Sequence, residues 1–250
     1  RGGSATEHFP IWHQEIEDIL VLKNNKGTED NRVRKLDYSI QVSKIFYERF
    51  IKDEEITLFS PNNVPGLYEA FGLPEFDELY LKYENNKKIP QTKIRAQILF
   101  MDLLKERAET GRIYIMNIDH CNTHSSFKDK VYMSNLCQEI TLPTKPVQHI
   151  DDPDGEIALC ILSAINLGLI KEKDELEELC DLSVRALDEI IDYQEYPVEA
   201  AKKSTEARRS LGIGYIGLAH YLAKNKVKYN NMEAWKLVDE VTEAFQYFLL

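Results

Sequence analysis

The stretch ALCILSAINLG, residues 158–168, constrains the fold most because nearly all of its side chains are apolar. A strand with one solvated face alternates apolar and polar residues, whereas a strand covered on both faces need not alternate. This stretch therefore predicts a strand buried on both sides. An amphipathic helix is predicted close by, over residues 174–194, and Cys180 on its apolar side is predicted to be a core residue. Buried strands mixed with helices predict an α/β fold.

Periodicity and turn residues place the other elements. A long helix is predicted to carry Ile94, Ile98, Met101 and Leu104 on one stripe and to stop at Gly111. No repeat, low-complexity tract or Gly/Ser linker interrupts the chain, so no internal domain boundary is predicted. Helices are predicted at 36–51, 64–72, 74–85, 91–110, 198–224 and 233–250, strands at 56–60 and 112–119, and an alternating segment at 135–143.

Charge and cysteine content narrow the classes of function. A net charge of −11 argues against long-range attraction to nucleic acid. A small phosphorylated ligand stays possible, because backbone amides at helix N-termini bind phosphates. No apolar run approaches the roughly 20 residues of a membrane helix, and no signal peptide is recognised. Four cysteines in such a chain suggest a reducing cytoplasm rather than a disulfide scaffold.

Two motifs point weakly to ligands. GIGYIG, residues 212–217, matches G-x-G-x-x-G, but the preceding TEARRS is polar where the dinucleotide fingerprint needs a hydrophobic strand. Glycines that let two helices approach closely are the preferred interpretation. DHCNTH offers His120, Cys121 and His124, yet a structural zinc site usually has a second ligand pair. The motif is interpreted instead as a hydrogen-bonded loop behind an active segment.

The strongest constellation is SNLCQEI, residues 134–140. In an extended segment Asn135, Cys137 and Glu139 would share one face. A neighbouring carboxylate raises a thiol pKa and so opposes thiolate chemistry. A thiol that reacts as a radical needs no thiolate, and Glu139 could accept a proton from the same substrate. Cys160 is either a core cysteine, the commoner case, or a second thiol near Cys137.

SNLCQEITLPTKP and GEIALCILSAINLG resemble the active-site core of the large catalytic subunit of class I ribonucleoside-diphosphate reductase. RGGSAT, NRVRKLDYSIQVSK, ITLFSPNNVPGLYEAFG, GRIYIMNIDHCNTHS and RRSLGIGYIGLAHYLAK resemble the same subunit in its usual order. The resemblance covers essentially the whole chain. It implies part of a ten-stranded α/β barrel, with Cys137 on the finger loop at its centre.

The resemblance also implies residue roles. Cys137 would become the thiyl radical that takes the 3′ hydrogen of the ribose. Glu139 would accept the 3′-hydroxyl proton, Asn135 would hydrogen-bond the ribose hydroxyls, and Cys160 would be one of two redox cysteines, with its partner outside this chain. Arg112 and Tyr114 match residues beside the radical route. The loop that reports the effector nucleotide to the active site is matched by Arg1, Gly2 and Gly3.

The implied partners lie outside the chain. They are a ribonucleoside diphosphate substrate, a radical-generating small subunit that holds the metal-radical cofactor, a second large subunit in a dimer, nucleoside triphosphate effectors, and thioredoxin or glutaredoxin as reductant. No metal, nucleic acid or membrane is expected to bind this chain itself.

Several parts of the family's subunit are not found in the sequence: the N-terminal effector domain, the first barrel half and the C-terminal part. Residues 1–250 are therefore predicted to form a partial catalytic barrel domain of a truncated or split subunit. Alone, it is expected to be inactive and poorly stable, because a half-barrel leaves strand edges and apolar faces uncovered. The alternative is a non-catalytic piece that keeps only the fold. Together, Asn135, Cys137, Glu139 and Cys160 favour catalysis.

Overall fold

A computed structural model describes residues 2–172 and 174–250 of the chain. They form two compact units, of which the first ends at Pro143 and the second begins at Thr144. The prediction of one partial barrel domain over residues 1–250 stays a prediction. Among the described helices, none is long and apolar enough to cross a membrane.

The first unit is built on a parallel sheet in the order β1 (Thr6–Pro10), β2 (Asp37–Val42) and β5 (Ile113–Asn117). Successive side chains of a strand point to opposite faces. One face carries apolar residues and the other carries four residues with polar groups. His8, Ser39 and Tyr114 are aligned by the register, and Gln41 lies two positions after Ser39 on β2. We call the side of the sheet that carries these four residues the polar face.

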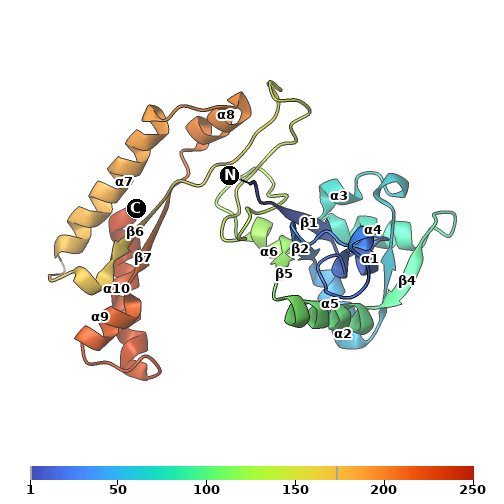
Figure 1. Cartoon of the computed structure of the whole chain (residues 1–250), viewed down its shortest axis with the longest axis horizontal. Coiled ribbons are helices and arrows are strands. Elements are labelled where there is room, and N and C mark those ends of the chain that lie inside the picture. The colour runs from blue at the N-terminus through green and yellow to red at the C-terminus, as the bar shows by residue number, and fades with distance from the viewer. Residues whose placement is uncertain (1, 173) are drawn as a thin grey trace. The chain divides into compact units, whose positions relative to one another are not determined.

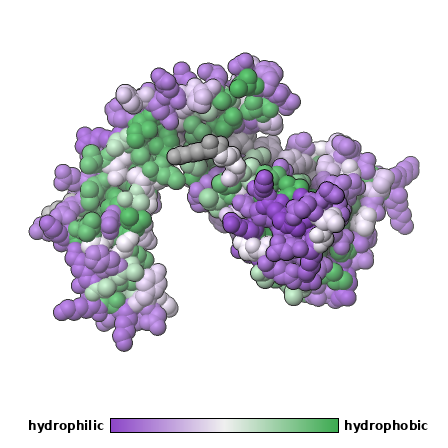
Figure 2. Space-filling model, in the orientation of Figure 1, coloured by the Kyte–Doolittle hydropathy of each residue, from purple (hydrophilic) through white to green (hydrophobic). Residues whose placement is uncertain are grey.

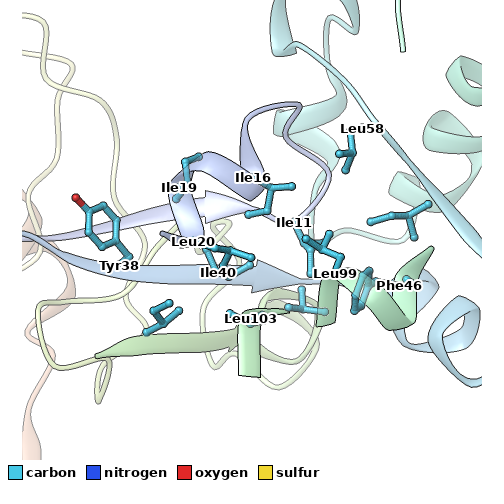
Figure 3. Close-up of a cluster of buried hydrophobic side chains, with 14 residues drawn as sticks. Ile11, Ile16, Ile19, Leu20, Tyr38, Ile40, Phe46, Leu58, Leu99 and Leu103 are labelled. Atoms are coloured by element: carbon cyan, nitrogen blue, oxygen red, sulfur yellow. The ribbon is translucent and has the colours of Figure 1, made fainter. Parts of the chain in front are cut away.

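The apolar face of this sheet packs against α1 (Ile16–Leu20), α2 (Lys44–Lys52) and α5 (Ala96–Thr110). Figure 3 shows this core, where Leu99 and Leu103 of α5 lie close to Ile40 of β2. The predicted stripe on α5 is therefore wrong. Ile98 and Met101 are 50% and 59% exposed. The helix begins at Ala96 rather than Gln91, and residues at spacings of three and four from its start form the buried face.

The rest of the first unit packs around a second core that includes Trp12, Phe71 and Phe76. An antiparallel pair, β3 (Glu55–Leu58) and β4 (Thr92–Arg95), lies in this unit, and the predicted strand near residue 56 is confirmed. The remaining elements are α3 (Leu67–Ala70), α4 (Phe76–Glu84), α6 (Ile118–Thr123) and 3-10 turns at Glu29–Asn31 and Pro61–Asn63.

The second unit pairs β6 (Leu162–Asn166) in parallel with β7 (Gly212–Ile216). Figure 1 shows α7 (Asp174–Tyr193) and α10 (Met232–Leu249) beside this pair, and Ile165 and Tyr215 pack into the core that these helices share with the strands. The unit also contains a 3-10 turn at Leu167–Leu169, α8 (Glu199–Arg208) and α9 (Leu218–Lys224).

The other face of the β6–β7 pair is uncovered. Leu162 and Ile216 are each 54% exposed, and hydrophobic residues, green in Figure 2, lie at the surface of this unit. The predicted strand is confirmed, but its burial on both faces is wrong in this chain. The helices cover only the face that carries Ile165 and Tyr215.

Two further predictions were wrong because short strands were taken for helices. Residues 36–51 form β2 followed by α2, and residues 198–224 form α8, β7 and α9. The GIGYIG glycines thus do not pack two helices together. Gly212 instead pairs with Leu162 of β6, and a Cβ on Gly212 would lie 2.4 Å from the end of the Leu162 side chain. Gly212 and Gly214 sit inside the strand rather than in a phosphate-binding turn after one.

Candidate active site

Asn135, Cys137 and Glu139 lie on one loop, residues 131–140, which we call the cysteine loop. The prediction of an extended segment over residues 135–139 is wrong. The Gln138 N–H donates to the Asn135 carbonyl at 3.2 Å, and Gln138 has a left-handed φ of 60°. This i to i+3 bond closes a β-turn, and asparagine is a favoured residue at its first position. The three side chains are therefore close in the chain but do not alternate along a strand.

Hydrogen bonds within the loop stabilise this turn. Asn135 Oδ1 accepts from the Ile140 N–H at 3.1 Å and lies 3.2 Å from Ser134 Oγ. Ser134 Oγ also lies 2.5 Å from the Ile140 carbonyl, to which it can donate. Residues 134–140 are thus closed into a compact unit, and Asn135 has a structural role in addition to the one predicted from the resemblance.

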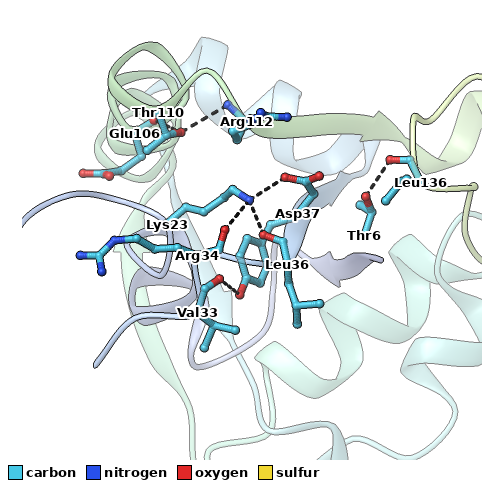
Figure 4. A network of polar contacts seen from close by, with 11 residues as sticks. Thr6, Lys23, Val33, Arg34, Leu36, Asp37, Glu106, Thr110, Arg112 and Leu136 are labelled. Atoms are coloured by element: carbon cyan, nitrogen blue, oxygen red, sulfur yellow. Dashed lines mark hydrogen bonds and ion pairs between the residues drawn. The ribbon is translucent and has the colours of Figure 1, made fainter. Parts of the chain in front are cut away.

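Side chains of the first unit hold the loop from several sides. Thr6 Oγ1 donates to the Leu136 carbonyl at 2.7 Å (Figure 4). Gln41 Nε2 donates to the Tyr132 carbonyl at 2.6 Å. Asn122 of α6 forms two hydrogen bonds with the backbone of Val131, at 2.9 and 3.0 Å. The DHCNTH motif is therefore helical rather than a loop, yet it does support the start of the cysteine loop.

The polar face lies next to the cysteine loop and was missed in the sequence. Ser39 and Gln41 are 0% and 1% exposed, and Gln41 contacts the loop directly. Burial lowers the pKa of His8, although a contact with the Ser134 backbone opposes that shift. Burial therefore favours the neutral imidazole of His8 over its charged form. The signal was the alternation of Ser39 and Gln41 with apolar residues, which is typical of a strand.

The reactive groups of the loop are accessible. Cys137 and Glu139 are both exposed, two positions apart around the turn. Both side chains are therefore open to a ligand from outside the loop. The arrangement offers a hydrogen-atom or proton donor and a proton acceptor side by side in sequence.

The other predicted residues are more scattered. Arg112 is exposed just before β5, and Tyr114 is half-buried on the polar face. Gly2 and Gly3 are exposed, whereas Arg1 lies outside the described residues. Cys160 is exposed just before β6 in the second unit. The structure thus brings Asn135, Cys137 and Glu139 together on one loop.

The remaining cysteines differ in environment. Cys180 is fully buried on α7, which confirms it as a core residue. Cys121 is half-buried on α6, and burial raises the pKa of its thiol. The rings of His120 and His124 lie 5.2 Å apart between centroids. Within residues 2–172 and 174–250, no group of three or more potential metal ligands is assembled.

Comparison with known proteins connects this geometry to a family. Residues 1–250 match the family described as "Ribonucleotide reductase, barrel domain". The chain is 60% identical over 255 residues to the ribonucleoside-diphosphate reductase subunit alpha of Haemophilus influenzae. It is 54% identical to the ribonucleoside-diphosphate reductase 1 subunit alpha of Escherichia coli and 44% identical to the ribonucleoside-diphosphate reductase subunit alpha of phage T4. Each alignment covers 100% of this chain and 33–34% of the relative.

The chain therefore spans about a third of the length of these curated relatives. The parallel pairing in both units agrees with the family's α/β barrel, and the fold class inferred from the sequence is confirmed. The chain belongs to the ribonucleotide reductase barrel-domain family.

Proposed function

We propose that this chain is the segment of a ribonucleoside-diphosphate reductase large subunit that carries the radical cysteine. The activity would be reduction of ribonucleoside diphosphates to deoxyribonucleoside diphosphates. The observation that supports it most is the exposed pair Cys137 and Glu139 on a loop held next to the polar face, in a chain of this barrel family.

The proposed chemistry assigns each group one step. The Cys137 sulfur, as a radical, takes the 3′ hydrogen atom of the ribose and becomes a thiol. Glu139 accepts the 3′-hydroxyl proton while the 2′-hydroxyl leaves as water with an added proton. Cys160 and a second thiol outside this chain supply that proton, the hydrogen placed on C2′ and the two electrons, and end as a disulfide, while Glu139 returns its proton to the 3′ oxygen. The 3′ hydrogen then returns to the sugar and regenerates the Cys137 radical.

Asn135 would orient the ribose hydroxyls, because its amide lies in the same turn as Cys137. Orientation matters in this reaction because hydrogen transfer and water loss involve adjacent carbons of one sugar. Arg112 and Tyr114 would lie beside the route by which the radical reaches Cys137. Gly2 and Gly3, with Arg1, would belong to the loop that senses the effector nucleotide.

Partners would complete the reaction. A metal-radical cofactor held by a small subunit would supply the oxidising equivalent. Thioredoxin or glutaredoxin would reduce the cysteine pair, and nucleoside triphosphate effectors would act on a dimer of large subunits in the cytoplasm. The uncovered β6–β7 face supports a need for further parts of the subunit, and we expect this chain alone to be inactive.

The test is a chimera in which these residues replace the matching segment of the Haemophilus influenzae subunit, assayed with its small subunit for deoxynucleotide formation. Cys137→Ser should abolish product, and Glu139→Gln should lower it strongly. Cys121→Ser, outside the loop, is the matched control and should keep activity. Equal product from the parent chimera and Cys137→Ser would reject the catalytic role and favour a non-catalytic piece.

A further inference from the structure

The Gln138 side chain bridges two strands from the position next to Cys137. Its Oε1 accepts from Ser39 Oγ of β2 at 2.5 Å, and its Nε2 donates to the Ile115 carbonyl of β5 at 2.8 Å. Both ends of one amide are therefore bound to the parallel sheet. Its backbone N–H also closes the turn with Asn135.

The partners of this amide are rigidly placed. Ser39 is fully buried in the central strand of the sheet, with β1 on one side and β5 on the other. Tyr114, which precedes Ile115, is the register partner of Ser39, so the two contacts lie at neighbouring levels of adjacent strands. A side chain with both polar atoms bound to such a sheet has little freedom to move.

Glutamine is not the residue that the backbone at position 138 favours. Its φ of 60° is in the left-handed region, where glycine and asparagine are tolerated best. Asparagine would suit the backbone but is one methylene shorter, so it could not reach both partners. Glycine would suit the backbone without making either contact. Glutamine is disfavoured by the local backbone conformation, but its side chain is long enough to bind both Ser39 and Ile115.

Other anchors hold the loop through its backbone. Thr6 binds the Leu136 carbonyl, and Gln41 binds the Tyr132 carbonyl. These bonds fix where the loop runs. Gln138 differs because it is covalently adjacent to Cys137 on the C-terminal side and crosses from the turn to two strands. Loss of its contacts would free the turn next to the sulfur while the ends of the loop stay attached.

We propose that Gln138 is a positioning residue that fixes the turn carrying Cys137 relative to the sheet. The structural part of this proposal concerns the loop alone. Its catalytic part rests on the proposed function, since the rate of hydrogen-atom transfer depends on where the sulfur is held.

The first experiment measures the loop in this chain by hydrogen exchange of residues 134–140 and by the alkylation rate of Cys137 with iodoacetamide. Gln138→Asn and Gln138→Gly should raise loop exchange about fivefold or more, and Ser39→Ala by about fivefold, as expected for a hydrogen bond of ordinary strength. The alkylation rate should change in the same variants. Because Ser39 acts through Gln138, adding Ser39→Ala to Gln138→Gly should have no further effect on the loop.

The matched control is Gln97→Asn. Gln97 lies on α5, and its Nε2 donates to the carbonyl of Phe50 on α2 at 3.1 Å, away from the loop. It should leave both loop readouts unchanged, and slow exchange at Leu99 should show that each variant is folded. The proposal would be overturned if Gln138→Asn and Ser39→Ala had the same loop exchange rate and the same Cys137 alkylation rate as the parent, within error.

The second experiment uses the chimera. Gln138→Asn should lower kcat tenfold or more with little change in KM, because the substrate contacts remain. An active parent chimera with an unchanged kcat in Gln138→Asn would overturn the catalytic part. A parent chimera whose product does not depend on Cys137 would instead reject the proposed function, and the loop measurements would still decide the positioning role.

Discussion

The ion pair between Arg49 of α2 and Glu84 of α4 allows a quantitative prediction for the first unit. Their side chains are only 11% and 12% exposed. Arg49 donates to both carboxylate oxygens, at 2.7 and 2.6 Å, and Thr57 Oγ1 lies 2.5 Å from one of them. Glu84→Gln keeps the shape but removes the charge, and it turns an amide N–H toward the guanidinium. Breaking a buried pair from one side costs about 3–5 kcal/mol.

The lower end of that range applies, because glutamine keeps one acceptor oxygen. We expect the free energy of unfolding to fall by about 3 kcal/mol, which for a unit of this size lowers Tm by about 10 °C. Urea unfolding followed by Trp12 fluorescence measures this unit, since Trp12 is 2% exposed in its core. A Trp235→Phe background removes the fluorescence of the second unit.

Glu48→Gln is the matched control, because its pair with Lys44 lies in the same unit with side chains 46% and 74% exposed. Exposed pairs contribute little, so its effect should stay below about 0.5 kcal/mol. If Glu84→Gln costs no more than Glu48→Gln at pH 7, the ion pair does not stabilise the unit as reasoned.

The pH dependence gives a second readout. Burial alone would raise the pKa of Glu84, but hydrogen bonds from Arg49 and Thr57 outweigh it and lower that pKa. A lowered folded-state pKa means that the stabilisation is present above the ordinary glutamate pKa of about 4.3. It is lost as pH falls through the lower folded-state value. The difference between parent and Glu84→Gln should therefore shrink below about pH 4, and a constant difference would contradict this assignment.

Three further predictions follow from single contacts. Tyr80→Phe should cost about 2 kcal/mol in the same urea assay, because the Tyr80 hydroxyl satisfies both the N–H and the carbonyl of buried Thr57. Gly72→Ala should lower the free energy of unfolding by more than about 1 kcal/mol, seen as a lower urea midpoint, since φ is +87° and a Cβ would lie 2.7 Å from an α6 side chain. Ellman's reagent should modify Cys137 in the folded chain but Cys180 only after unfolding, and Cys137→Ser should remove one fast-reacting thiol.

Long helices were predictable from the sequence because their signals are local. The apolar spacing over residues 174–194 and 233–250 gave helices that match α7 and α10 closely. Gly111 ends α5 in the left-handed conformation, as a helix-terminating glycine should. These features need only neighbours within a few turns of the chain.

The strand β2 was missed for a physical reason. Its polar residues, Ser39 and Gln41, are buried and bind a loop about 100 residues away in sequence, and Gln41 also contacts Met116 of the second core. The alternation typical of a strand spans only a few residues and is followed directly by the helix α2, so the whole of residues 36–51 was taken for one helix. Only the later chain, which supplies Gln138 and Tyr132 as partners, makes the strand explicable.

The turn at Cys137 illustrates the same limit. Alternation over residues 135–139 predicted an extended segment, and the residues singled out there do lie together on one loop. The structure has a turn there instead, closed by hydrogen bonds within residues 134–140 and bound through Gln138 to Ser39 and Ile115, which are 99 and 23 residues away. A short sequence window contains the local partners of this turn but not the two strands to which Gln138 binds.

The β6 strand shows a different relation between sequence and structure. Its continuous apolar pattern encodes two covered faces, yet Leu162 of β6 and Ile216 of β7 remain 54% exposed on the same side of the pair. A single exposed leucine would carry no information, but here two large apolar side chains, one from each strand, lie on the same face of the pair. Since strands of a closed barrel are lined on the inside by side chains from other strands, the pattern fits the environment of the barrel family rather than that of this unit.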